Sequence, residues 1–549
     1  MNNKILINIY LSLGVFILFT FQSLNYRIDL TNYQRFSLNT DSITLIKQIK
    51  KKINIDVFLS GDLPHSYRKL SVEAKEILNT FKSINKNFNV NFINPFEGNT
   101  SIESVITEMT SYGMNPDYIV DTRNQSRDQK IVFPWAIIND GNSSVIISLL
   151  ESNIGISNEQ KIINGIKQLE YKLVDGLYRL SNDVKLKLAF ITSHKTSPSI
   201  KISDWVKALQ MYYEVSVFDL KKYKLNPKKT FDNLTTFPLL IISNPKEIFS
   251  LEEKFILDQY QINGGNILWL VDAVKINIES LFKNDGVAVA VKNDLGLDDY
   301  FFNYSLRLNT ELIMDIYCAP LVIANGNGNQ TQYVPFPWVY YPISKPNNTT
   351  INKTNIGSLW FRFVSPIDTL KSSASKIYLV TSSNYNQLQT IPSVIDLKTA
   401  INPIKANEFN LKSKLVAVLS EGNYKSLFKN KISPISQIIQ KNNGNSKFIL
   451  ISDGQFAENQ VENNKPLELG YDKWTNNFYS NKKFLMNSVH YLIGSKNLLK
   501  IRSKDIKINL LDQIKIKNRS IYETILFLVT PLLFLLCLNM ILRSLRKSY

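Results

Sequence analysis

The stretch SLEEKFILDQYQINGGNILWLVD, residues 250–272, has the pattern of a helix followed directly by a strand. Ser250 and Glu253 have the spacing of a capping box, which predicts that a helix begins there. Gly264 and Gly265 predict its end, because glycine readily adopts the left-handed backbone that closes a helix. The apolar run that follows at once predicts a buried strand. A helix that leads directly into a buried strand is typical of a βαβ unit.

Further apolar runs surround this stretch, with helical segments between them. They are Leu186–Thr192, Val215–Leu220 and Pro238–Ser243, and Trp205–Tyr212 lies in a helical segment. Strands that are apolar on both faces and alternate with helices form parallel sheets. We therefore expect a doubly wound, Rossmann-like α/β domain over residues 156–300.

A further α/β unit is expected over residues 26–155. Strand patterns at Ile53–Leu59 and Phe88–Ile93 flank an amphipathic helix, and the polar linker 139–142 joins two strands as a hairpin. Residues 301–515 contain many Asn, Pro and Tyr residues, which predicts a C-terminal α/β extension with long loops.

Two long helices are expected in the soluble region. Ser157 and Gln160 have capping-box spacing, and apolar residues line one side of the segment that follows. This pattern predicts a helix that connects the first unit to the second. The last helix of the soluble region is expected over Asn481–Ile493.

Two uncharged apolar runs lie near the ends of the chain. Ile5–Leu24 and Thr524–Leu542 each approach the roughly 20 residues that cross a bilayer as a helix. A cleaved signal peptide is the alternative for the first run, but Asn25, Tyr26 and Arg27 make a poor cleavage site. We expect an N-terminal transmembrane anchor in residues 1–25 and a C-terminal transmembrane helix with a basic tail in residues 516–549. The bulk of the chain would then lie in the periplasm of a bacterium, held at the inner membrane.

The charge and the cysteines exclude several classes of function. The formal charge is +18, but the lysines are spread over all 549 residues and form no single block. We interpret this excess as compositional drift, and a periplasmic location excludes a nucleic-acid partner. Cys318 and Cys537 are expected in different compartments, so no disulfide is predicted. No Cys and His residues have metal-ligand spacing, and no metal or cofactor is predicted.

The motifs of common enzymes are absent from the sequence. There is no Gly-x-x-x-x-Gly-Lys-Ser/Thr P-loop, so the chain is not an ATPase of that class. Neither Gly-x-Ser-x-Gly nor His-Glu-x-x-His occurs. We predict a protein that is not an enzyme.

Polar residues at strand ends are the best candidates for contact with a ligand or partner. His194, Asp272 and Asp453 each follow an apolar strand, where doubly wound sheets place their ligand-binding residues. His194 and Asp272 are the residue types of a catalytic pair, but no nucleophile accompanies them. We favour a structural or recognition role. Trp338 belongs to an aromatic cluster that is either a recognition patch or, as we favour, the core of a small sheet.

The order and spacing of several short motifs resemble the GldG family, gliding-motility-associated ABC transporter subunits of Bacteroidetes. The motifs are Asp29-Leu30-Thr31, Arg35-Phe36-Ser37-Leu38, Phe133-Pro134-Trp135-Ala136, Lys254–Tyr260, Gly264-Gly265, Trp269-Leu270-Val271-Asp272, Cys318-Ala319-Pro320, Asp453-Gly454, Leu469-Gly470-Tyr471 and Asn481–Leu492. The resemblance covers almost the whole chain. Two departures are Trp135, where the family has Gly, and Ser193-His194-Lys195, where it has Gly-His-Gly-Glu.

The resemblance implies an auxiliary subunit whose sheet is related to class I glutamine amidotransferases but has no catalytic cysteine. It further implies two partners, a separate ABC ATPase and a multispanning permease, and a link to gliding motility or cell-envelope export. The alternatives are a membrane-anchored periplasmic hydrolase and a cell-wall-binding scaffold with no transporter partner.

Overall fold

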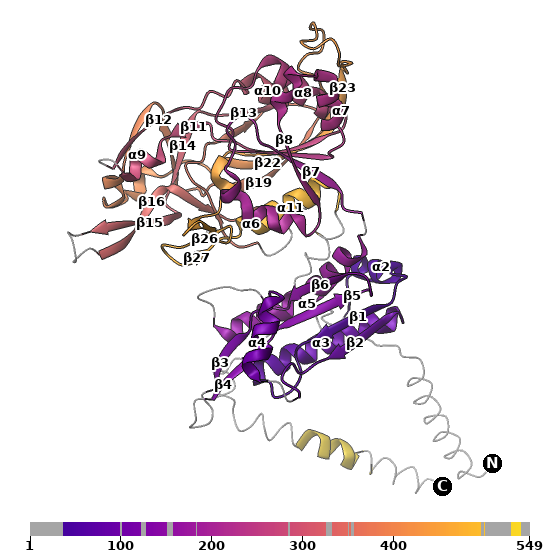
Figure 1. Cartoon of the computed structure of the whole chain (residues 1–549). Coiled ribbons are helices and arrows are strands. Elements are labelled where there is room, and N and C mark those ends of the chain that lie inside the picture. Colours follow the sequence, from indigo (N-terminus) through magenta and orange to yellow (C-terminus); the bar gives the residue numbers. More distant parts are fainter. Residues whose placement is uncertain are drawn as a thin grey trace. The chain divides into compact units, whose positions relative to one another are not determined.

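The computed structural model describes most of the chain between Ser37 and Ser495 (Figure 1). The described residues are 37–98, 101–121, 128–150, 157–182, 184–283, 286–325, 332–349, 351–352, 356–495, 499, 529–537 and 539. The predicted anchor Ile5–Leu24 lies outside them, and only part of Thr524–Leu542 lies inside, as helix. Among the described residues, no helix combines the length and the apolar character that crossing a membrane requires.

The first α/β unit has one four-stranded sheet with the order β2-β1-β5-β6. Its elements are α2 (Thr40–Gln48), β1 (Ile53–Val57), α3 (His65–Ile84), β2 (Phe88–Phe92), α4 (Ile102–Ser111), β3 (Asp117–Asp121), β4 (Asp128–Val132), β5 (Trp135–Asn139), β6 (Ser144–Ser148) and α5 (Asn158–Ser181). Strand β1 is parallel to β2 and antiparallel to β5, which pairs with β6 as the predicted hairpin. Strands β3 and β4 form a separate two-stranded sheet between α4 and β5.

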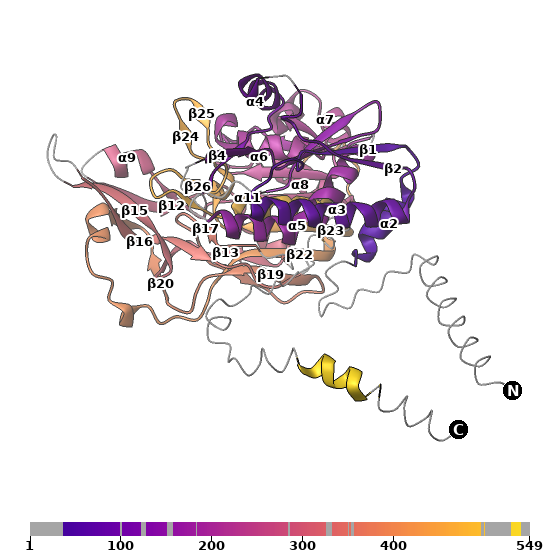
Figure 2. The same cartoon turned by 90° about the horizontal axis from the view of Figure 1, so that it is seen from below.

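Helices α3 and α5 pack side by side in this unit (Figure 2). Helix α3 buries Leu70, Ala74, Leu78 and Phe81, which recur every three or four residues on one side of the helix. Fully burying each large aliphatic side chain stabilises the fold by about 1.5–3 kcal/mol. Ser157 accepts the N–H of Gln160 at the start of α5, as its spacing predicted.

The second unit is a seven-stranded sheet with the order β19-β22-β23-β10-β9-β7-β8. Its strands in chain order are β7 (Lys187–Ile191), β8 (Glu214–Phe218), β9 (Leu239–Ser243), β10 (Asn266–Leu270), β19 (Ser375–Thr381), β22 (Leu415–Lys425) and β23 (Asn443–Ile451). Pairing is parallel from β8 through β23 and antiparallel for β22 and β19. The expected parallel α/β sheet is therefore present.

Strands from both sides of residue 300 share this sheet, because Leu268 of β10 pairs with Ile449 of β23. The expected boundary between residues 300 and 301 therefore runs through a single sheet. The segment between β10 and β22 holds strands β11 (Val274–Ile276), β12 (Val287–Lys292), β13 (Leu306–Leu308), β14 (Glu311–Asp315), β15 (Cys318–Asn325), β16 (Gln332–Ser344), β17 (Leu359–Trp360), β18 (Ile367–Thr369), β20 (Asn386–Thr390) and β21 (Ser393–Asp396). The β15–β16 hairpin extends away from the seven-stranded sheet in both views (Figures 1 and 2).

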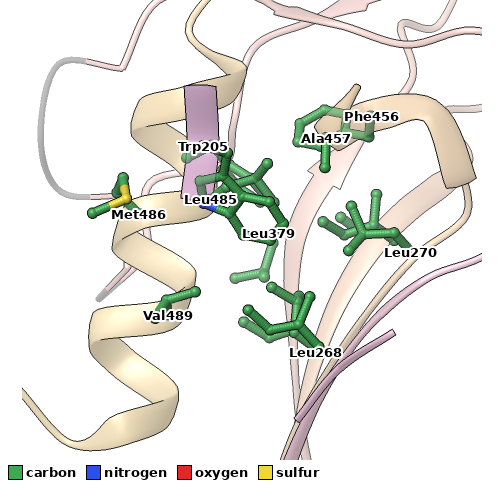
Figure 3. Close-up of a cluster of buried hydrophobic side chains, with 14 of the residues drawn as sticks. Trp205, Leu268, Leu270, Leu379, Phe456, Ala457, Leu485, Met486 and Val489 are labelled. Atoms are coloured by element: carbon green, nitrogen blue, oxygen red, sulfur yellow. The ribbon is translucent and has the colours of Figure 1, made fainter. Parts of the chain in front are cut away.

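Helices cover both faces of the seven-stranded sheet. They are α6 (Ser199–Gln210), α7 (Pro227–Leu234), α8 (Leu251–Ile262) and α11 (Asn481–Ile493), with short helices η1 (Leu220–Lys224) and η5 (Gly454–Ala457) at strand ends and α9 (Ile278–Lys283) and α10 (Asp298–Asn303) further along. On one face, Trp205 of α6 and Leu485 of α11 pack with Leu268 and Leu270 of β10 (Figure 3). Every one of these four side chains is fully buried, so this cluster is the centre of the core.

Candidate functional site

The carboxyl edge of the parallel strands brings together two of the four residues singled out from the sequence. Asp272 follows β10 and Asp453 follows β23, and these strands are neighbours. The backbone N–H of Gly454 donates to Oδ1 of Asp272 at 2.6 Å. The two aspartates therefore meet around one peptide, as expected for equivalent positions on adjacent parallel strands.

Asp453 is fully buried and its carboxylate is held by backbone donors. Oδ2 accepts the N–H of Arg362 at 2.7 Å, and Oδ1 accepts the N–H of Gln455 at 2.8 Å, which caps the short helix η5. Removal from water raises the pKa of Asp453 above its ordinary value, despite the nearby Arg362. Removal from water also raises the pKa of Asp272, and repulsion by Asp453 adds to this effect. The pair therefore holds protons more strongly than two isolated carboxyl groups.

Glu458 is a third carboxylate at this edge, and the sequence analysis did not identify it. Its Oε1 accepts from Asn244 Nδ2 and from Ser197 Oγ, both at 2.9 Å, and Lys201 Nζ lies 3.3 Å from Oε2. Burial by itself would raise the pKa of Glu458, but Lys201, Arg362 and the two hydrogen bonds lower it overall. Glu458 is thus a buried anion with its charge compensated.

Close approach at this edge requires glycine at position 454. A Cβ atom on Gly454 would lie 2.7 Å from Oδ1 of Asn244 and 2.9 Å from Oδ2 of Asp272. Asn244 follows β9 and has a positive φ of 53°, a conformation that asparagine tolerates better than most residues. The ends of β9, β10 and β23 are therefore packed directly against one another.

His194 lies at the carboxyl end of β7 but joins a different set of side chains. Its Nε2 atom is 3.0 Å from Oε2 of Glu253 and its Nδ1 atom is 3.0 Å from Oγ of Ser193. The imidazole stacks on Phe249, with ring centroids 3.8 Å apart and planes at 7°. The described contacts of His194 contain no hydrogen bond to Asp272 or Asp453, so the structure does not form the pair considered from the sequence.

Glu253 is the second residue that the sequence analysis missed as a partner. Ser250 and Glu253 form the predicted capping box at the start of α8, and Oε2 of Glu253 accepts the N–H of Ser250 at 2.8 Å. Burial would raise the pKa of Glu253, but His194 and the Ser250 N–H lower it overall. One carboxylate thus caps a helix and orients an imidazole.

Trp338 is a core residue and not part of this edge. Its side chain is 1% exposed, and its ring lies 5.1 Å from that of Tyr340 in a cluster under the small sheets. Tyr340 and Tyr341 are buried as well. This packing agrees with the core interpretation of the aromatic cluster.

The first unit contains no cysteine. A cavity of about 420 Å³ lies between α2 and the end of α5. Leu177, Leu180 and Ile53 line its apolar part, and Asp140 and Lys51 form an ion pair of 3.1 Å beside it.

Among the described residues, no group of three or more His, Cys, Asp or Glu residues is arranged to hold a metal ion.

Comparison with known families places the sheet domain. The family described as an ABC-type uncharacterized transport system matches residues 185–488, more than half of the chain. The chain belongs to this family of ABC transporter auxiliary proteins. The matched range begins just before β7 and ends within α11, so the family domain includes the whole seven-stranded sheet.

The other comparisons add little to this assignment. A domain of unknown function, DUF7088, matches residues 32–139 in the first unit. No curated protein matches the chain. The solved structure titled "mmIFT52 N-terminal domain" aligns over 56% of this chain and 96% of its own, at 14% identity with a TM-score of 0.31. That likeness is too weak for an inference about fold or function.

Proposed function

We propose that this chain is a non-catalytic, membrane-anchored auxiliary subunit of an ABC transporter. Its membership of the transport-associated family supports the auxiliary role. The uncharged runs Ile5–Leu24 and Thr524–Leu542 support anchors in the bacterial inner membrane, with the sheet domain in the periplasm. The partners proposed are a separate ABC ATPase and a multispanning permease, because the chain has no P-loop of its own.

The state of the carboxyl edge is the observation that carries this proposal. Doubly wound sheets bind their small-molecule ligands at this edge. Here Asp272, Asp453 and Glu458 accept hydrogen bonds from the protein itself, and Glu253 takes up His194. The side chains that would do chemistry hold the domain together, so we infer that it acts by contact with partners.

The joint between α5 and the sheet domain is a route for such contact to be transmitted. Tyr212 OH donates to Oδ1 of buried Asp175 at 2.7 Å, and Arg179 Nε lies 3.1 Å from Oδ2 of the same residue. Asp175 and Arg179 both belong to α5, so their ion pair lies within that helix. Tyr212 follows α6, so its hydrogen bond to Asp175 connects the two α/β units. We infer that movement of the permease is passed between the units through this joint.

The biological setting follows from the resemblance alone. We propose a GldG-like subunit of a complex that serves gliding motility or cell-envelope export. The motifs quoted above, from Asp29-Leu30-Thr31 to Asn481–Leu492, support this setting.

A pull-down in mild detergent tests the complex. We expect the tagged full-length chain to retain a multispanning permease and a P-loop ATPase, identified by mass spectrometry. Recovery of the chain alone, or with cell-wall material, would contradict the transporter role.

The joint has its own test in the purified complex. Tyr212→Phe should leave the complex intact. It should change the ATPase activity of the complex, because the auxiliary subunit no longer transmits movement through this joint. Tyr385→Phe, at an exposed tyrosine, is the control. Equal ATPase activity in the two variants would contradict transmission through this joint.

A further inference from the structure

The loop between β22 and β23 exposes two isoleucines almost completely. Ile432 is 95% exposed and Ile439 is 91% exposed. Single exposed apolar residues are common on proteins, but two such side chains on one ordered loop are unusual. We call residues 426–442 the isoleucine loop.

The base of the isoleucine loop is fixed by two side chains of α8. Asp258 Oδ1 accepts the N–H of Leu427 at 2.9 Å. Gln259 pairs with the backbone of Lys441, accepting its N–H at 2.7 Å and donating to its carbonyl at 3.1 Å. These bonds hold both ends of the loop on α8, and the N–H of Ser426 donates to the carbonyl of Asn442 at 2.9 Å.

The interior of the loop is packed and its tip is not. Phe428, Ile435 and Ile438 are at most 5% exposed and join the core, where the ring of Phe428 lies 5.1 Å from that of Phe255. Ile432 and Ile439 are left exposed on a loop whose other isoleucines are buried.

The charged residues within the loop and its flanking strand ends have one sign. No Asp or Glu occurs between Glu421 and Asp453, and the exposed lysines of this stretch are Lys425, Lys429, Lys431 and Lys441. Within the described residues, no ion pair joins any of these four lysines to an acidic side chain. Aliphatic tips that protrude among unpaired lysines match the chemistry of an anionic lipid surface, where the apolar groups enter the acyl boundary and the ammonium groups stay with the phosphates.

The isoleucine loop lies at the same edge of the seven-stranded sheet as the end of its last helix. The loop precedes Asn443, so it lies at the amino edge of the parallel strands. The last turn of α11 lies at the same edge, because Asn266 at the start of β10 donates to the carbonyl of Leu492 at 3.0 Å. In the sequence, the predicted membrane helix Thr524–Leu542 comes after this helix.

We propose that the isoleucine loop docks on an anionic phospholipid bilayer. Ile432 and Ile439 insert, and Lys429 and Lys431 bind the lipid phosphates. The occupant is a lipid surface and not a folded acidic protein. Hot spots between proteins cluster in well-packed, fully desolvated pockets. The two isoleucines are instead single exposed side chains among lysines, which suits a lipid surface.

The test is fluorescence quenching by nitroxide-labelled lipids. The full-length chain, with Cys318→Ala and Cys537→Ala, carries an environment-sensitive fluorophore on Ile439→Cys and is reconstituted in vesicles. The vesicles contain phosphatidylcholine alone or phosphatidylcholine and phosphatidylglycerol in equal parts. The control label is on Ile248→Cys, which is 61% exposed and lies beside the acidic Glu247.

We expect strong quenching at position 439 only in the anionic vesicles, and weak quenching at position 248 in both. Lys429→Glu with Lys431→Glu should abolish the quenching, whereas Lys228→Glu with Lys229→Glu, an equal charge change on α7, should not. Raising salt to 1 M, where the Debye length falls to about 3 Å, should weaken it. Quenching at 439 no greater than at 248, or equal in neutral vesicles, would overturn the proposal.

A second measurement covers the case in which the cysteine-free chain does not fold. Hydrogen exchange of the unaltered chain should show protection of the isoleucine loop in anionic but not in neutral vesicles. Equal exchange in both would overturn the proposal. Neither measurement needs a partner subunit, so failure here is distinguishable from failure of the pull-down.

Discussion

Nε2 of His194 lies 3.0 Å from Oε2 of Glu253, the carboxylate oxygen that also accepts the N–H of Ser250. The end of β7 is thereby tied to the start of α8. Because His194 has a φ of 67°, this contact also holds a backbone conformation that a non-glycine residue rarely adopts.

Glu253→Ala should lower the stability of the fold, because this carboxylate both caps α8 and contacts His194. Loss of a cap costs about 0.5–2 kcal/mol, and a buried group left without its partner costs about 1–3 kcal/mol. The check is the midpoint of thermal unfolding of the purified chain. Glu252→Ala, in the same helical turn but outside the capping box, is the control. Equal shifts for both variants would show that the link to His194 is unimportant.

Asp272→Asn should make stability less dependent on pH. Since the folded-state pKa values of Asp272 and Asp453 are raised, the native pair binds more protons than the unfolded chain between about pH 4 and the raised values. The protonated pair contributes its full stability at a pH below the pKa of the aspartates in the unfolded chain. This contribution is lost as the pH rises through the pKa values of the aspartates in the folded chain.

The neutral amide introduced by Asp272→Asn keeps an acceptor for the N–H of Gly454 and removes the repulsion between the two carboxylates. We expect a higher thermal midpoint than that of the natural chain at pH 8 and a smaller difference at pH 5. Asp232→Asn, at an exposed aspartate, should give no such trend. A gain of the same size at both pH values would contradict the coupling of the two aspartates.

Gly454→Ala should destabilise the domain because its Cβ would lie within 2.9 Å of Asn244 and Asp272. Overpacking of this kind typically costs about 1–3 kcal/mol. Asn244→Gly removes one of the two obstacles and also suits the positive φ at that position. In a double-mutant cycle, unfolding should show that Gly454→Ala costs less in the Asn244→Gly background. If the changes in unfolding free energy of the two substitutions were additive, the contact between the new Cβ atom and Asn244 would not be the source of the destabilisation.

Trp338→Ala should cost about 3–5 kcal/mol, the usual range for a buried aromatic side chain. The matched control is Trp474→Ala, because Trp474 is 59% exposed whereas Trp338 is 1% exposed. Circular dichroism during thermal unfolding compares the two. If Trp338 served recognition more than packing, both variants would unfold at similar temperatures.

Local patterns predicted the elements of the sheet domain well and their long-range pairing poorly. Helix α11 spans Asn481–Ile493 as expected, and the capping box of α8 is present as expected. Both depend on contacts within a few residues, which a sequence displays directly. The partner of β10 is instead β23, and nothing in either apolar run specifies which strand it joins.

The candidate site shows the same division. Asp272 and Asp453 were identified because each ends an apolar strand, and adjacency of β10 and β23 brings them together. Glu458 and Ser197 were missed, since their meeting depends on how η5 and the chain before α6 fold over the strand ends. The one available signal was that Glu458 follows Asp453 closely in a segment with few other charges.

The pairing of β10 with β23 also means that the sheet cannot be completed until late in synthesis. Roughly 170 residues separate the two strands, so at about 5–20 residues per second β10 waits on the order of ten seconds or more before its neighbour exists. During that interval one edge of the apolar strand Asn266–Leu270 has unpaired backbone N–H and C=O groups. These groups can pair with another nascent chain close by. Nascent chains of this protein should therefore depend on a chaperone that binds unfolded segments. Expression at a high level should yield aggregates in which chains pair through β10.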